Sequence, residues 1–179
     1  MAKLPASSGD DVARFLKKVA ETPAPATRAG ERGRLIFAMD ATASREPSWD
    51  RACQIQGDMF SETSLLGGLE VQLLFYRGFG QCQASKWTPN ANRLLRFMES
   101  VRCLGGATQI EKVLKHAIRE TGVRQVNALV FIGDAMEEDV DALCRHAGEL
   151  GLLNVPAFVF QEGGDPIAER AFRQIARLT

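Results

Sequence analysis

The sequence predicts an α/β domain with a Rossmann-like, mostly parallel sheet, one antiparallel edge strand and helices on both faces. The first observation is a set of short apolar runs that are near-continuous rather than alternating, which is typical of strands covered on both faces. The second is that segments with apolar residues at helical spacing lie between these runs, an order that favours parallel strands joined by right-handed crossovers. The predicted parallel strands are Leu35–Met39, Val71–Tyr76, Ala128–Ile132 and Val155–Phe160.

The helices are predicted from apolar residues that recur three and four positions apart. Gly122 and Gly151 directly follow two of these segments and predict their C-terminal ends. Asp165-Pro166 predicts the cap of the last one. The predicted helices are Ser48–Thr63, Asn90–Val101, Gln109–Thr121, Glu138–Leu150 and Asp165–Leu178.

The antiparallel strand is expected after the second apolar run. Gly78-Phe79-Gly80 predicts a tight turn there, so Gln81–Trp87 returns beside the strand before it.

The first 33 residues are expected to form a separate segment, followed by the domain over residues 34–179. Asp10–Glu21 has apolar residues at helical spacing and is ended by Pro23-Ala24-Pro25. A polar, glycine-containing linker then runs to Gly33. We expect this helix to pack on the domain, with docking on a partner as the alternative.

Composition and charge limit the classes of function. The 179 residues are 45% hydrophobic and 25% charged, with a formal net charge of zero, which gives no general attraction to nucleic acid or an anionic membrane. No apolar leader and no run of about 20 apolar residues is present, so a secretory signal and a spanning helix are not expected. The four cysteines are widely spaced without a CxxC pair, which favours free thiols and a cytoplasmic location.

Polar residues are predicted to converge at the carboxyl edge of the sheet, where ligands bind in folds of this kind. Asp40 directly follows the first strand, and Asp134 follows the third long one. The helix before that strand runs in the opposite direction, so its first turn, with Thr108 after Gly105-Gly106, reaches the same edge.

The loop after the first strand adds hydroxyl groups to this edge. In Asp40-Ala41-Thr42-Ala43-Ser44 an oxygen-bearing side chain stands at every second position, and alternate side chains of an extended loop face the same way. Two carboxylates, three hydroxyls and water form an all-oxygen set that suits Mg²⁺, with Mn²⁺ or Ca²⁺ as other candidates. The alternative is that Thr42 and Ser44 only cap the following helix.

These elements resemble the metal-ion-dependent adhesion site of von Willebrand factor A (vWA) domains, over about residues 34–179. The first loop resembles the DxSxS element, and Thr108 and Asp134 resemble the other two parts of the site. The resemblance implies that Thr42, Ser44 and Thr108 contact Mg²⁺, that the carboxylates often act through water, and that a partner's Glu or Asp completes the coordination.

The chain departs from the family pattern in four ways. Thr42 stands where Ser is usual, and Gly133-Asp134-Ala135 replaces the commoner Thr-Asp-Gly. Four acidic residues crowd the same rim and are expected to oppose an acidic partner: Glu137, Glu138, Asp139 and Asp141. Family members usually have a further strand and helix, so we expect a shortened variant or a truncated domain whose strand at Val155–Phe160 is an open edge.

A partner-binding rim is expected in the loops around this site. Arg45, Trp49, Arg77 and Phe79 are its main candidates, because arginine and aromatic side chains are frequent binding anchors. Arg77 is the first choice because Gly78 and Gly80 leave it prominent.

The competing interpretation is a Mg²⁺-dependent phosphohydrolase of the haloacid dehalogenase type. Such enzymes use an Asp nucleophile after the first strand, and their last motif is similar to the segment from Gly133 to Glu138. They also need an acid/base carboxylate two positions after the nucleophile, where this chain has Thr42. His116 and His146 are expected to be solvated or at helix ends.

The sequence therefore predicts a non-catalytic, metal-dependent protein-binding module. It leaves open which partner binds, which divalent ion is held and how many copies of the chain associate.

Overall fold

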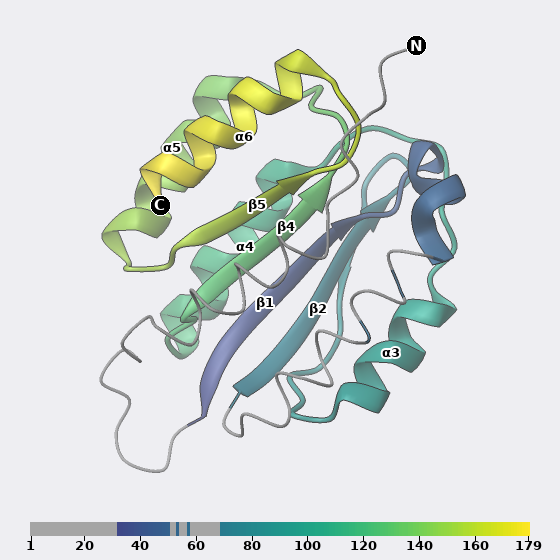
Figure 1. Cartoon of the computed structure of the whole chain (residues 1–179). Coiled ribbons are helices and arrows are strands. Elements are labelled where there is room, and N and C mark those ends of the chain that lie inside the picture. The colour runs from purple at the N-terminus through teal and green to yellow at the C-terminus, as the bar shows by residue number, and fades with distance from the viewer. Residues whose placement is uncertain (1–31, 51–52, 54–56, 58–68) are drawn as a thin grey trace.

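A computed structural model of the chain describes residues 32–50, 53, 57 and 69–179. They form one five-stranded sheet with the strand order β3-β2-β1-β4-β5 (Figure 1). The strands are β1 (Gly33–Asp40), β2 (Leu69–Arg77), β3 (Gln81–Ala84), β4 (Ala128–Gly133) and β5 (Ala157–Gln161).

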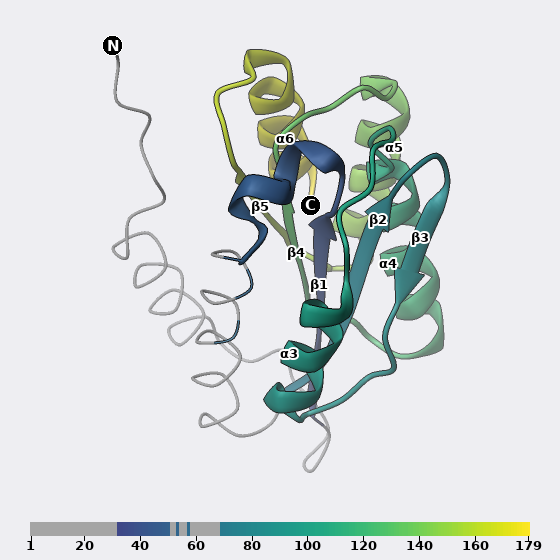
Figure 2. The same ribbon diagram turned by 90° about the vertical axis from the view of Figure 1, so that its right-hand side faces the viewer.

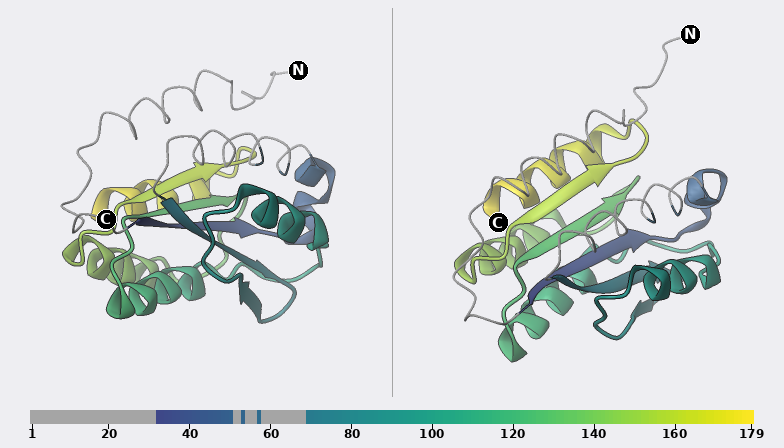
Figure 3. Two further views of the ribbon diagram at one scale, coloured as in Figure 1. Left: turned by 90° about the horizontal axis from the view of Figure 1, so that it is seen from below. Right: turned by 60° about the horizontal axis from the view of Figure 1, so that its bottom comes forward.

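The central strand β1 pairs in parallel with β2 on one side and β4 on the other. Asp40 stands opposite Tyr76, and Met39 stands opposite Ile132. In both views of Figure 3 the arrowheads of β1, β4 and β5 point to the same end of the molecule. The first and third predicted strands therefore end side by side, as the site prediction requires.

The strand β3 runs antiparallel to β2 at one edge, which confirms the predicted antiparallel edge strand. It ends at Ala84 rather than Trp87, and Thr88 forms an isolated bridge with Val71.

Helices cover both faces of the sheet, as predicted (Figure 2). The helices are α3 (Ala91–Ser100), α4 (Ile110–Val123), α5 (Val140–Leu152) and α6 (Pro166–Leu178). Alternate residues of β1 contribute to two different cores: Ile36 and Ala38 pack with residues of α4, α5 and α6, whereas Phe37 and Met39 pack with residues of α3 and with Trp49. A 3-10 turn, η1 (Ala43–Arg45), leads into helical residues 46–50.

The predicted cap of the last helix is confirmed, because the Asp165 carboxylate accepts hydrogen bonds from the backbone N–H groups of Ile167 and Ala168. The two predicted glycine stops are wrong. Gly122 lies inside α4, and Gly151 lies inside α5. A Cβ at Gly151 would stand 2.2 Å from the carbonyl oxygen of Leu178, so this glycine permits close packing against the end of α6.

The N-terminal helix predicted at Asp10–Glu21 and most of the helix predicted at Ser48–Thr63 lie outside the described residues. The strand β1 begins at Gly33, the last residue of the predicted linker. In the part of the chain that the structure describes, no helix is long and apolar enough to cross a membrane.

Candidate metal centre

Asp40 ends β1 with its side chain fully buried. Its Oδ1 accepts a hydrogen bond from the backbone N–H of Thr42 (2.7 Å), and its Oδ2 accepts one from the hydroxyl of Tyr76 (2.9 Å). Burial raises the pKa of Asp40 because it disfavours the charged form, and these hydrogen bonds oppose the rise. The carboxylate is therefore fixed in place, in surroundings where a nearby cation would favour its ionised form.

The hydroxyls of Thr42 and Ser44 lie 3.1 Å apart, as the alternation in the loop predicted. Thr42 is buried and Ser44 is exposed. Thr42 precedes the turn η1, but its side chain makes no capping hydrogen bond there. The capping alternative therefore does not account for this hydroxyl.

Thr108 comes shortly before α4 and is held from the neighbouring loop by Glu137. The Thr108 N–H donates to Oε2 of Glu137, and the Glu137 N–H donates to the Thr108 hydroxyl oxygen, both at 3.1 Å. The backbone of the Thr108 loop also touches the first loop, through a hydrogen bond from Leu104 N–H to the Ala41 carbonyl (3.1 Å). Thr108 and the first loop are therefore parts of one edge.

Asp134 follows β4 and lies close enough to Asp40 for its charge to contribute to the raised pKa of that carboxyl. Its Oδ1 is buried and accepts no hydrogen bond from the residues that the structure describes. A buried carboxylate oxygen without a partner is costly, because its hydration has been lost without replacement. A cation at this point would remove that cost, so the residues present fit a metal ion.

The donor set is made of oxygen only. Within the described residues, no cluster of three or more His, Cys, Asp or Glu side chains is placed to hold a metal. An ion here would therefore use two carboxylates together with hydroxyls and water, a set that suits a hard divalent cation.

The acidic residues of the neighbouring loop are engaged at helix N-termini. The Glu138 carboxylate accepts from the backbone N–H groups of Ile110 (2.5 Å) and Glu111 (2.9 Å), at the start of α4. Asp139 caps α5 in the same way. Helix N-termini carry partial positive charge, so these contacts offset part of the negative charge expected to oppose an acidic partner.

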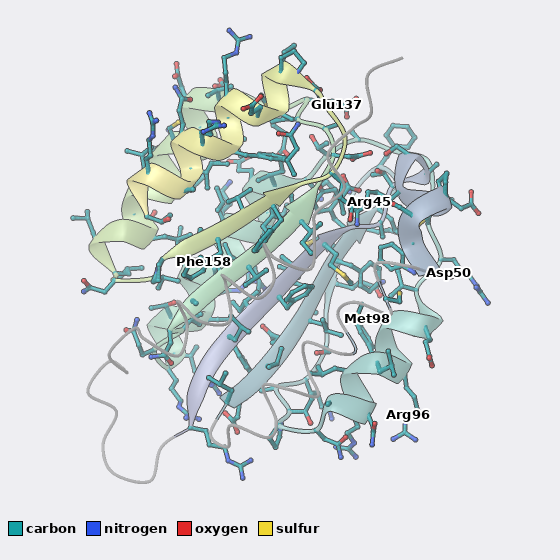
Figure 4. All side chains as sticks on the ribbon, viewed as in Figure 1. Arg45, Asp50, Arg96, Met98, Glu137 and Phe158 are labelled. Carbon is teal, nitrogen blue, oxygen red and sulfur yellow. The ribbon has the colours of Figure 1, made fainter. Side chains whose placement is uncertain are left out.

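Two of the four predicted rim residues are buried. Arg45 is 1% exposed and Trp49 is 7% exposed, so the prediction that they present their side chains to a partner is wrong. Arg45 lies near the carboxyl ends of the strands (Figure 4), where its Nη1 is 2.9 Å from Oε2 of Glu162. The hydroxyl of Ser48 donates to that same oxygen, at 3.0 Å.

Of the other two rim residues, Arg77 ends β2 and Phe79 lies in the turn between β2 and β3. Phe79 is 91% exposed. Arg77 is half-buried and donates to the carbonyl oxygen of Arg102 (2.7 Å) and to Oε1 of Gln81 (2.9 Å).

Sequence reasoning missed Tyr76 and the role of Glu137. Tyr76 is the only tyrosine in the chain and ends the second apolar run, a signal that was available but not interpreted. Burial raises the pKa of Tyr76 well above its ordinary value, so its hydroxyl remains a donor to Asp40.

The histidines differ from their predicted placement. His116 is buried, with Nε2 2.8 Å from Oε1 of Gln72 and Nδ1 2.9 Å from Nη2 of Arg119. Burial lowers the pKa of His116. His146 lies in the middle of α5, 3.2 Å from Oε1 of Glu111.

Comparison with known proteins finds similarity in structure but not in sequence. No family model and no curated protein sequence matches this chain. The VWA domain of SpRpn10 superposes with a TM-score of 0.65 at 14% identity, covering 80% of this chain and 82% of that one.

Two further solved structures carry a metal in their description. Manganese-loaded TRAP protein of Plasmodium vivax has a TM-score of 0.65 at 15% identity, covering 83% of this chain and 64% of that one. Proximal thread matrix protein 1 from the mussel byssus, with a zinc-occupied MIDAS motif, has a TM-score of 0.64 at 14% identity, covering 82% and 39%. The described part of the chain therefore has a vWA-like fold, as its sequence predicted.

Proposed function

We propose that the chain is a non-catalytic, divalent-metal-dependent protein-binding module. Asp40, Thr42, Ser44, Thr108 and Asp134 would hold the ion, which is Mg²⁺ in this proposal, with Mn²⁺ and Ca²⁺ as competitors. The observation that carries the proposal is the buried Oδ1 of Asp134, which has no hydrogen-bond partner among the residues that the structure describes and lies near the buried carboxylate of Asp40.

The ion would supply a Lewis-acidic site for an oxygen ligand from another protein. The two carboxylates would formally balance the charge of a divalent ion, but in this proposal they act through water and the neutral hydroxyls contact the ion directly, so the ion would keep affinity for a further anionic oxygen. A carboxylate of a protein partner would fill that position. The engagement of Glu137 and Glu138 at the start of α4 supports this, because it offsets negative charge on the rim.

The phosphohydrolase alternative finds less support in the structure. Thr42 stands where such an enzyme needs its acid/base carboxylate, and its hydroxyl lies against Ser44. Such an enzyme also needs a lysine that neutralises the phosphoryl charge. Lys112 and Lys115 both lie in α4, where the Nζ of Lys112 donates to the Gly80 carbonyl and to Oε1 of Gln109, and Lys115 pairs with Glu111. Metal-dependent phosphate release that is lost in Asp40→Asn would overturn the binding proposal.

A cytoplasmic setting is part of the proposal. The four cysteines have no disulfide partner in the described part of the chain, which is compatible with a reducing compartment.

Thermal unfolding with Mg²⁺, Mn²⁺ or Ca²⁺, against EDTA, tests the metal site. A metal ion whose free concentration is 100 times its Kd stabilises the folded chain by about 2.7 kcal/mol. For a domain of this size, that raises Tm by roughly 5–10 °C. We expect Asp134→Ala to abolish the shift and Asp141→Asn, which changes an exposed acid of α5, to keep it. The proposal fails if no ion shifts the wild type or if Asp134→Ala responds as the wild type does.

A further inference from the structure

We infer that the partner presents, close to its metal-binding carboxylate, a large apolar side chain that packs on Phe79 and Leu104; this rests on the proposed function. Phe79 is 91% exposed and Leu104 is 47% exposed. We call these residues, together with Arg77, Arg102 and Lys112, the hairpin patch. Burying an exposed Phe side chain contributes about 1.5–3 kcal/mol of favourable free energy, which a partner would gain by covering Phe79.

The backbone that carries the hairpin patch is defined by glycine conformations and by hydrogen bonds. Gly78 (φ 59°) and Gly80 (φ 127°) have left-handed backbone conformations that set the turn around Phe79. Leu104 lies beside this turn, because its Cδ2 would be 3.1 Å from a Cβ placed on Gly78, and its carbonyl accepts from the Gly78 N–H (3.3 Å).

Residues at the start of α4 also form hydrogen bonds to the backbone of this turn. The Gln109 side chain donates to the carbonyl oxygens of Arg77 (3.2 Å) and Gly78 (3.0 Å), and Lys112 Nζ donates to that of Gly80 (3.0 Å). Because these contacts already order the backbone of the turn, a partner that covers Phe79 would not have to order that backbone on binding.

The charge of the hairpin patch complements an acidic partner. Residues 77–81 and 101–109 contain Arg77 and Arg102 and no acidic residue, and Lys112 is bonded to the turn. The acids Glu137 and Glu138 lie in the loop after β4, where they accept hydrogen bonds from backbone N–H groups of Thr108 and of the start of α4. A partner segment with a carboxylate would therefore be drawn toward the hairpin patch rather than toward the loop after β4.

The reach between the two contacts is short. Asp40 stands opposite Tyr76 on the neighbouring strand, about 5 Å away, and Phe79 follows Tyr76 by three residues, which span at most about 10 Å. The backbone positions of Asp40 and Phe79 therefore lie within about 15 Å, which an extended partner segment covers in at most about five residues. The inferred ligand is therefore a protein segment with Asp or Glu and, at most about five positions away, a large apolar residue.

Selection from a phage-displayed library of random short peptides, on the immobilised full chain in Mg²⁺, tests this inference. The enriched peptides are then synthesised and their affinities measured in Mg²⁺ and in EDTA for wild type, Phe79→Ser and Arg102→Glu. Leu152→Ser is the matched control, because Leu152 is 86% exposed at the C-terminal end of α5, away from the site. Melting temperatures show that each variant is folded.

We expect enriched peptides to combine an acidic and a large apolar residue and to bind Phe79→Ser at least about tenfold more weakly. Arg102→Glu also weakens binding, whereas Leu152→Ser leaves it unchanged. Acidic peptides without an apolar neighbour, equal affinity for Phe79→Ser, or no enrichment from a chain that shows the metal-induced Tm shift would each overturn the inference. Loss of the Tm shift in wild type would instead overturn the proposed metal site.

Discussion

Replacing Tyr76 by Phe isolates one hydrogen bond of the proposed metal site. The change removes the hydroxyl that donates to Oδ2 of Asp40 (2.9 Å) and keeps the ring, which stacks on Phe131 with centroids 6.2 Å apart. A hydrogen bond to a charged acceptor contributes about 1.5–3 kcal/mol, and both side chains are fully buried, so the free energy of unfolding should fall by about that amount.

The same change should weaken metal binding. Groups that orient a metal ligand typically change affinity about 10- to 100-fold when removed, and we expect Tyr76→Phe to raise the Kd for Mn²⁺ within that range. The pKa of Asp40 should rise further, because a hydrogen bond that opposes the effect of burial is lost. Since a metal ligand must be ionised, binding should then fail at a higher pH than in wild type.

Urea unfolding in EDTA and calorimetric Mn²⁺ titration over a pH series measure these effects. Thr121→Val is the control, because it removes a hydroxyl that donates to the Ala117 carbonyl (2.8 Å) within α4. It should leave the Mn²⁺ affinity unchanged. An Mn²⁺ affinity in Tyr76→Phe within twofold of wild type, with the same pH midpoint, would refute the positioning role of Tyr76.

Two further predictions concern stability. Gly106→Ala places a Cβ 2.1 Å from the Gly78 carbonyl oxygen and should lower the free energy of unfolding by about 1–3 kcal/mol. Gly105→Ala is the control and should change it far less, because its Cβ would meet nothing within 4 Å in the described part of the chain. Equal losses for the two variants in urea unfolding would contradict the packing argument. Burial lowers the pKa of His116 below its ordinary value of about 6.5, so the unfolded chain binds more protons below that pH and stability should fall as the pH drops. His116→Gln, compared by urea unfolding at a series of pH values, should flatten that dependence, and an unchanged slope would contradict it.

The prediction from sequence succeeded where the signal is local. A strand buried on both faces must be apolar along its whole length, so the runs around Phe37 and Val130 identified β1 and β4 without knowledge of their neighbours. Asp165 caps the helix that directly follows it, so three adjacent residues suffice to recognise the cap. Parallel strands also share one direction, which was enough to place Asp40 and Asp134 at the same edge.

The remaining features depend on which distant residues meet, and only the tertiary structure decided those. Tyr76 reaches Asp40 because the β1–β2 register sets them opposite each other, and a one-residue shift would turn Tyr76 to the other face. Glu138 caps α4 rather than its own helix, because the loop after β4 packs against the start of α4. Arg45 is buried because Glu162, at the end of β5, offers it a carboxylate 117 positions along the chain. The sequence by itself thus determined the strands, most of the helices and the edge where polar groups gather. Packing between distant segments determined which side chains of this edge are buried, such as Arg45, and which are exposed, such as Phe79, since such contacts leave no periodic trace in the chain.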